Sequence, residues 1–293
     1  MKSGMVSLVG RPNVGKSTLL NQLLETKLAI TSDKAQTTRN IIEGIYNDED
    51  TQIVFIDTPG IHKPKYKLGN VLNGKAYNST TSADLVLFLI DAESGFGRGD
   101  QFILDKLKEL DVPIILILNK VDKMKKELLL KTIDMTKDLY NFAEIIPVSA
   151  LKGDNVLHLI SVIKKYLPGT EKIYDDSTVT NISNFFYISE IVREKVLRLT
   201  KEEVPHAVTC LVENFEEDEK LVHIQVLIIV DRDNLKKIII GKNGSMLKEI
   251  GTYAREDLET YFGKKVFLET YVRTINNWRD REKYLLEFGL KEE

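Results

Sequence analysis

The chain has 293 residues, 43% of them hydrophobic and 29% charged, which is enough for two globular domains of ordinary size. Its net charge of −3 excludes an overall basic protein, so a surface for a polyanion has to be a local patch. The only cysteine, Cys210, excludes an internal disulfide, and the longest apolar runs, at 85–90 and 226–230, are far shorter than the roughly 20 residues that span a bilayer, so we expect a soluble cytoplasmic protein.

The first 167 residues alternate short apolar runs with amphipathic stretches of helical period. Helical stretches include 101–110 and 156–167. Continuous Val, Ile and Leu runs are typical of strands buried on both faces. The pattern therefore predicts an α/β domain over 1–167, with a mostly parallel sheet covered by helices on both sides. The predicted strands are 5–9, 41–46, 52–56, 84–90, 113–118 and 144–148.

The rhythm breaks at 168–181, where Pro, Gly, Asp and Thr predict a linker. A different order of elements follows, which predicts a smaller α+β domain over 182–293. Cys210 lies in a strand-like run of this domain and is expected to be buried. The elements expected after the linker are a helix at 184–200, strands at 206–214 and 221–230, helices on both sides of a Gly-x-x-Gly sequence, a strand at 264–272 and a final helix.

The sequence GRPNVGKST, residues 10–18, fits the pattern G-x-x-x-x-G-K-[ST] between a predicted strand and a predicted helix. This context predicts a P-loop whose backbone N–H groups face phosphate oxygens at a helix N-terminus. Lys16 is expected between the β- and γ-phosphates, and Ser17 is expected to offer its hydroxyl to Mg²⁺. The loop residues expected to bind nucleotide are Gly10, Asn13, Val14, Gly15, Lys16, Ser17 and Thr18.

Two further segments are placed to sense the γ-phosphate. Asp57 ends the strand before DTPG and is expected to hold the water shell of Mg²⁺, while Gly60 can give a backbone N–H to the γ-phosphate. The loop SDKAQTTRN, residues 32–40, contains a threonine that can bind Mg²⁺ only while GTP is present. We choose Thr38 over the neighbouring Thr37. The predicted magnesium ligands are thus Ser17, Thr38 and Asp57.

The base is identified by NKVD, residues 119–122, after a buried strand. The carboxylate of Asp122 can accept two hydrogen bonds from the N1–H and N2–H₂ edge of guanine, whereas adenine presents no such pair of donors. Lys120 is expected along the base, and Asn119 is expected to brace the loops. The residues Ser149, Ala150 and Leu151 add a backbone N–H toward guanine O6. The combined set predicts binding of GTP and GDP rather than ATP.

The elements GRPNVGKS, QTTR, DTPG and NKVD resemble those of the translation-factor-related GTPases whose residue after DTPG is hydrophobic, here Ile61. The resemblance implies that Ile61 is not the catalyst. The attacking water would then be held by backbone groups, a reordered loop or a bound cation, which leaves Asn13, Thr38 and Gly60 as candidates. In potassium-stimulated relatives the loop asparagine helps bind K⁺, so Asn13 with carbonyls of loop 27–38 is our candidate K⁺ site.

In the second half, IIIGKNGSMLKEIG, residues 238–251, carries G-x-x-G between two helical patterns. The order of elements around it matches a type II KH domain, in which a glycine loop clamps the backbone of about four nucleotides. Residues 232–248 hold five basic side chains against one acid, a local patch that fits RNA. The predicted RNA-binding residues are Lys236, Lys237, Gly241, Lys242, Asn243, Gly244 and Lys248. Most residues of the apolar run 226–230 are expected to be core, and some are candidates for the groove beneath the bases.

The whole chain resembles the Era family of bacterial ribosome-assembly GTPases, from the phosphate loop through PHAV (205–208) and GKNG to VRTINNWRD (272–280). The resemblance implies binding to the 3′ end of small-subunit ribosomal RNA, a role in assembling the 30S subunit, and peripheral contact with the inner membrane. None of these roles requires an oligomer, so we expect a monomer. Two alternatives stay open at this point: an RNA-binding chaperone with a vestigial GTP site, and a GTPase of tRNA modification.

Overall fold

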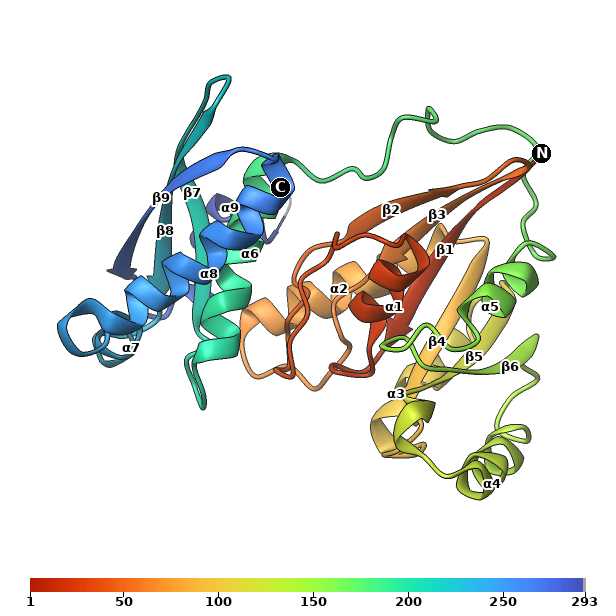
Figure 1. The fold of residues 1–293 in the computed structure, drawn as a ribbon. Coiled ribbons are helices and arrows are strands. Elements are labelled where there is room, and N and C mark those ends of the chain that lie inside the picture. Colours follow the sequence, from red (N-terminus) through yellow and green to blue (C-terminus); the bar gives the residue numbers. More distant parts are fainter. Residues whose placement is uncertain (292–293) are drawn as a thin grey trace. The chain divides into compact units, whose positions relative to one another are not determined.

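The computed structural model describes residues 1–291, and the chain forms two compact units (Figure 1). Two short segments from the N-terminal half belong by their contacts to the second unit. The first unit comprises Met1–Ala29, Thr38–Pro64 and Gly69–Asn181, and the second comprises Ile30–Thr37, Lys65–Leu68 and the chain from Ile182 onward.

The first unit is built on a six-stranded sheet in the order β2-β3-β1-β4-β5-β6. β2 runs antiparallel to β3, and the four other pairings are parallel. The mostly parallel sheet predicted from the apolar runs is therefore confirmed. The strands are β1 (Lys2–Gly10), β2 (Ile42–Asn47), β3 (Thr51–Asp57), β4 (Leu85–Asp91), β5 (Ile114–Asn119) and β6 (Glu144–Val148).

Both faces of this sheet are covered by helices. Successive side chains of each buried strand point to opposite faces, so each strand contributes apolar side chains to both. One face packs alternate residues of β4 and β5 in an apolar cluster with α2, α3 and the partly buried side chains of α4. On the other face α1 and α5 contact each other. α2 was not among the helices named from the sequence, and its segment is rich in Asn, Gly and Thr, which have low helix propensity. The helices are α1 (Lys16–Leu23), α2 (Lys67–Thr81), α3 (Arg98–Leu107), α4 (Lys126–Thr136) and α5 (Val156–Ile163).

The segment 168–181, predicted as a linker, is irregular but pairs with the first unit along its length. Gly169 bridges to Ser3, and Thr180 bridges to Gly44. Between these points the buried side chain of Gln52 accepts hydrogen bonds from the backbone N–H groups of Ile173, at 2.7 Å, and of the next residue, at 2.9 Å. These contacts assign the segment to the first unit.

The second unit contains a three-stranded sheet in the order β7-β8-β9, antiparallel between β7 and β8 and parallel between β8 and β9. Helices α6 and α8 contact each other and pack on this sheet (Figure 1). The predicted order of elements is confirmed. The bounds are α6 (Asn184–Leu199), β7 (Val208–Glu217), β8 (Leu221–Val230), α7 (Asp233–Ile240), α8 (Ser245–Phe262), β9 (Lys265–Thr274) and α9 (Glu282–Glu287).

The core of the second unit lies between this sheet and its helices. Cys210 is 5% exposed within it, so its predicted burial is confirmed. Val226, Ile228 and Val230 of the apolar run in β8 also point into this core. Among residues 1–291, no helix combines the length and the apolar character needed to cross a membrane.

Candidate functional site

The phosphate loop joins β1 to α1 and is shaped by glycines with no space for a side chain. A Cβ on Gly10 would lie 2.4 Å from a carbonyl oxygen of β4, and one on Gly15 would lie 2.2 Å from Asn119 Nδ2. Gly15 also has a φ of 99°, in the left-handed region. Because α1 begins at Lys16, the free N–H groups of its first turn and its dipole favour an anion at this end.

Lys16 folds back over the phosphate loop. Its ammonium donates to the carbonyl oxygens of Gly10 at 3.2 Å and Arg11 at 3.0 Å. Burial lowers the pKa of Lys16 to about 8, although the nearby Asp57 carboxylate acts in the opposite direction. A phosphate in the loop would supply the negative charge that favours the protonated form of this lysine.

Three oxygen-bearing side chains converge beside the loop. Ser17 Oγ lies 2.6 Å from Asp57 Oδ2 and 2.8 Å from Thr38 Oγ1, and Thr38 Oγ1 lies 3.3 Å from Asp57 Oδ2. Asp57 is fully buried, and burial raises its pKa despite the charge of Lys16. Its Oδ1 is buried with no hydrogen-bond partner in the described residues. Mg²⁺ prefers oxygen ligands, and this donor set, with an unsatisfied carboxylate oxygen, fits Mg²⁺.

The segment after Asp57 touches the phosphate loop through its backbone. A Cβ on Gly60 would lie 2.7 Å from the N and Cα atoms of Pro12, so only glycine fits. The next N–H, of Ile61, donates to the carbonyl oxygen of Gly10 at 3.2 Å. The Ile61 side chain is 2% exposed and packs in the apolar cluster with α2 and α3. An apolar side chain buried in the core cannot orient a water molecule.

Asn119 connects two loops at the carboxyl edge of the sheet. Its Nδ2 donates to the carbonyl oxygen of Val14 at 2.7 Å, and its Oδ1 accepts the backbone N–H of Ala150 at 3.0 Å. A single buried side chain thus holds the phosphate loop against the loop at 149–151.

The rest of the base-binding set is held by two short polar contacts. Ser149 Oγ donates to Asp122 Oδ1 at 2.6 Å, which orients the carboxylate. Lys120 Nζ donates to Asp91 Oδ2 at 2.7 Å. Although burial of Asp91 acts to raise its pKa, the hydrogen bond and charge of Lys120 hold that pKa below its usual value. Asp91 was not predicted, because it meets Lys120 only through the pairing of the neighbouring strands β4 and β5.

The remaining predicted nucleotide residues lie around the same loop edge. Asn13 is exposed on the turn of the phosphate loop, with a φ of 65°. Val14 is buried beneath that loop, and Thr18 lies on the first turn of α1. The side chain of Leu151 is 68% exposed, so this residue can offer its backbone to a ligand but leaves its apolar side chain in solvent.

In the second unit, the G-x-x-G loop makes the turn between α7 and α8. Gly241 and Gly244 have φ values of 73° and 77°, and Asn243 between them has 51°. A Cβ on Gly241 would lie 2.7 Å from that of Met246, whereas Gly244 has open space around it. Lys242 and Asn243 are exposed at the tip of the loop. α8 therefore begins at an open glycine flanked by a cationic side chain.

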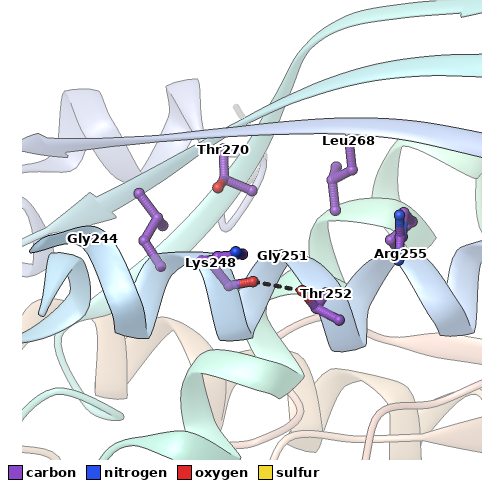
Figure 2. Close-up of a pocket in the computed structure, with 8 residues that line it drawn as sticks. Gly244, Lys248, Gly251, Thr252, Arg255, Leu268 and Thr270 are labelled. Atoms are coloured by element: carbon purple, nitrogen blue, oxygen red, sulfur yellow. Dashed lines mark hydrogen bonds between the residues drawn. The ribbon is translucent and has the colours of Figure 1, made fainter.

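A groove of about 530 Å³ follows this loop, between the exposed face of α8 and strand β9 (Figure 2). Its volume is in the usual range for ligand pockets. Gly251 lines it without a side chain, and the carbonyl of Lys248 accepts the Thr252 hydroxyl at 2.9 Å. The lining residues are Gly244, Leu247, Lys248, Gly251, Thr252, Arg255, Leu268 and Thr270.

Of the predicted RNA-binding residues, Gly244 and Lys248 line the groove. Gly241, Lys242 and Asn243 form the adjoining loop, while Lys236 and Lys237 lie on α7 and are not among the lining residues. Several lining residues were not predicted. Gly244, Lys248, Gly251 and Arg255 follow one another by three or four positions, and this helical spacing could have identified the α8 side of the groove.

The β9 side of the groove comes from tertiary structure. Leu268 and Thr270 lie on the third strand, whereas the run 226–230 is buried, as expected for most of its residues, and is not among the lining residues. The sequence carries no local signal that β9 rather than β8 faces α8 across the groove.

Comparisons with known proteins match both halves of the chain. Residues 5–120 match the family described as 50S ribosome-binding GTPase, and residues 203–279 match the KH domain family. A crystal structure of Era in complex with MgGDPNP and nucleotides 1506–1542 of 16S ribosomal RNA is 42% identical, with a TM-score of 0.97. A structure of an Aquifex aeolicus Era point variant bound to GDP and AlF4⁻ is also 42% identical, with a TM-score of 0.96. Both matches cover 100% of this chain and 100% of the other.

Proposed function

The chain belongs to the Era family of GTPases, and we propose that it uses GTP binding and hydrolysis to control its binding to the 3′ end of 16S ribosomal RNA. The observation that carries the proposal is the pairing of two sites in one chain. One is the cluster of Ser17, Thr38 and Asp57 beside the phosphate loop, and the other is the groove between α8 and β9.

Each polar group of the first site has a part in holding nucleotide. Asp122, oriented by Ser149, would accept the guanine edge, and Lys16 would contact the β- and γ-phosphates. Ser17, Thr38 and Asp57 would hold Mg²⁺. When bound, this ion neutralises the charge on the phosphate oxygens during transfer.

Hydrolysis has to proceed without a glutamine, since Ile61 is buried and apolar. We propose that the Gly60 N–H fixes the γ-phosphate and that backbone groups around Thr38 hold the attacking water. K⁺ bound near Asn13 and carbonyls of loop 27–38 would add positive charge at the transition state. Turnover is expected to fall below the 1–100 s⁻¹ typical of kinases, because no side chain orients the water.

RNA binding is proposed for the groove of the second unit. The loop Gly241–Gly244 lets a nucleic-acid backbone approach closely, and Lys242 and Asn243 would contact its phosphates. Lys248 and Arg255 add two cations along α8, while Leu268 on β9 offers an apolar surface to a base. The groove therefore suits a short single strand of about four nucleotides.

The biological setting follows from this RNA. We propose that the protein acts as a monomer in the cytoplasm on the 30S subunit or its precursor. Peripheral contact with the inner membrane is an expectation from the family resemblance.

The proposal is tested by measuring affinity for a 3′-end 16S RNA with a non-hydrolysable GTP analogue and with GDP, alongside GTP turnover. We expect tighter RNA binding with the analogue by a factor of about 5–150, the usual range of coupling between sites. Equal affinities would remove the switch. A protein that binds RNA but turns over no GTP would instead favour an RNA chaperone with a vestigial nucleotide site.

A further inference from the structure

A segment that carries no nucleotide motif, residues 91–100, joins β4 to α3 and has an aspartate at each end. Asp91 is the last residue of β4, and Asp100 lies in the first turn of α3. Each carboxylate contacts a cationic side chain of the nucleotide site, Lys120 of NKVD or Arg11 of the phosphate loop. All of these residues belong to the first unit. We call the segment 91–100 the β4–α3 brace.

The Asp91 end of the brace is fixed by backbone hydrogen bonds. Asp91 Oδ1 accepts the N–H groups of Glu93 at 3.1 Å and of Ser94 at 3.4 Å, so the carboxylate closes a turn at the end of β4. The N–H of Ala92 donates to the carbonyl oxygen of Asn119 at 2.9 Å. This contact ties the brace to the first residue of NKVD.

Lys120 meets the second oxygen of the same carboxylate. Its Nζ lies 2.7 Å from Asp91 Oδ2, and the two side chains are only 26% and 14% exposed. The backbone of Lys120 has a φ of 68°, in the left-handed region that is strained for a residue with a Cβ. A lysine side chain has many rotamers and keeps one direction only where a partner holds it. Asp91 therefore directs the lysine that we expect to lie along the base.

The Asp100 end of the brace is buried. Asp100 has no exposed surface, and its Oδ2 accepts the N–H of Gly97 at 2.9 Å, while its Oδ1 accepts Arg11 Nε at 2.9 Å. Burial raises the pKa of Asp100, whereas the Gly97 N–H and the Arg11 guanidinium favour its charged form. A Cβ on Gly99 would lie 2.6 Å from Arg11 Cδ, so the arginine passes closely over the start of α3. Because a buried carboxylate is costly without a partner, this pair fixes the arginine side chain.

Arg11 carries this restraint into the phosphate loop. Its carbonyl oxygen accepts the ammonium of Lys16 at 3.0 Å, so a single residue joins Asp100 to the lysine that we expect beside the phosphates. The two ends of the brace thus act on the two lysines of the nucleotide site, Asp91 directly on Lys120 and Asp100 through Arg11 on Lys16.

We propose that the β4–α3 brace is a positioning element of the nucleotide site, in which Asp91 orders Lys120 for the base and Asp100 orders Arg11 and the phosphate loop. The inference rests on the proposed function, since it requires a guanine nucleotide in this site, and it adds two residues that no nucleotide motif contains. A side chain that is ordered before binding need not be immobilised by the ligand, which favours binding about 2- to 12-fold. The base and the β-phosphate are common to GDP and GTP, so the brace raises both affinities.

The test uses the full chain, a ribose-labelled fluorescent GDP and the matching non-hydrolysable GTP analogue. Asp91→Asn removes the charge without changing the size of the side chain, and the amide oxygen can still accept the N–H groups of the turn. It should lower both affinities about 2- to 12-fold. In a Lys120→Ala protein the same change should cause no further loss, because Asp91 acts through Lys120. A general structural effect of Asp91→Asn would instead lower affinity by the same factor in both proteins.

Asp100→Asn and Arg11→Ala form a second cycle, with non-additive losses expected for both nucleotides. Because Asp100 is buried, the melting temperature of each protein is recorded without nucleotide. Should Asp100→Asn fail to fold, Arg11→Ala and Arg11→Lys test the same pair from its side chain that is 33% exposed. Arg11→Lys keeps a cation for Asp100 and should recover part of the affinity that Arg11→Ala loses. Tighter binding by the Asp100→Asn protein would show that Asp100 withholds Arg11 from the phosphates, and would overturn this half of the proposal.

Glu93→Gln is the matched control within the brace. The carboxylate of Glu93 lies 3.7 Å from Lys123 Nζ, but the two side chains are 55% and 50% exposed, and such a surface pair contributes little. This variant should bind both nucleotides as the unchanged protein does. Additive losses for Asp91→Asn and Lys120→Ala, or no loss for Asp91→Asn, would overturn the proposal. If the unchanged protein bound neither nucleotide, the proposed function would fail before any variant was compared.

Discussion

Replacing Gly60 by alanine should slow GTP hydrolysis and weaken binding of a GTP analogue without changing the affinity for GDP. The added Cβ would lie 2.7 Å from the N and Cα atoms of Pro12 and 2.9 Å from its Cγ. These atoms belong to the phosphate loop, which Asn119 and Lys16 hold in place. The segment carrying residue 60 therefore has to withdraw.

The size of the effect follows from that withdrawal. Ordinary van der Waals contact begins at 3.4 Å, so the segment must retreat by the difference from 2.7 Å, or 0.7 Å. A hydrogen bond from the N–H of residue 60 to the γ-phosphate would lengthen from about 2.9 Å to about 3.6 Å and would no longer form. A hydrogen bond to a charged group contributes about 1.5–3 kcal/mol, so the loss should be about 10- to 100-fold.

The assay is single-turnover GTP hydrolysis, with affinities for GTP analogue and GDP measured by fluorescence titration. Gly74→Ala is the control, because a Cβ at this α2 position meets nothing within 4 Å. It should leave turnover unchanged and stabilise the helix by about 0.5–1 kcal/mol. Hydrolysis at the unchanged rate by the Gly60→Ala protein would refute the reasoning.

Three other predictions concern the base, the cation and the RNA. Asp122→Asn should shift preference from guanosine to xanthosine nucleotides, because an amide cannot accept two hydrogen bonds from the guanine edge; competition binding measures this. Exchange of K⁺ for Na⁺ at matched ionic strength should slow turnover, since the smaller ion does not fit a K⁺ site near Asn13. Arg255→Ala should weaken RNA binding at every sequence and reduce the slope of log affinity against log salt by about one.

Each of these three predictions would be contradicted by a specific result. Retained guanine preference in the Asp122→Asn protein would remove the assignment of the base site. Equal turnover in the two salts would exclude the K⁺ hypothesis. For the RNA prediction, the control is Arg273→Ala. Arg273 is an odd number of positions from the groove-lining Leu268 and Thr270 of β9, so its side chain points to the opposite face of the strand. Equal losses for Arg255→Ala and Arg273→Ala would contradict the assignment of the groove.

Most of the correct predictions came from motifs whose residues lie close together along the chain. The phosphate loop, DTPG and NKVD follow buried strands directly, and parallel strands bring their carboxyl ends to one edge. The structure accordingly brings Ser17, Thr38 and Asp57 within hydrogen-bond distance of one another. The fold class followed from the same runs of apolar residues. Helix α2 was missed because its Asn, Gly and Thr residues have low helix propensity, and tertiary packing decides the outcome there.

Contacts between distant parts of the chain could not be predicted from a single sequence. Segments 30–37 and 168–181 are both polar and irregular, yet the first is fixed on α6 and the second pairs with the six-stranded sheet. Their composition predicts a lack of regular structure but not a binding partner. The β9 side of the groove depends in the same way on the fold as a whole.

The most direct test of an RNA-gated GTPase is GTP turnover in K⁺ buffer with and without an RNA that copies the 3′ end of 16S ribosomal RNA. The account predicts faster turnover with this RNA, and loss of the stimulation in a Gly244→Asp variant, whose carboxylate would repel the phosphate backbone at the open glycine. Basal turnover of that variant should match the unchanged protein. Turnover that does not respond to the RNA, or a response that survives in the Gly244→Asp variant, would contradict the account.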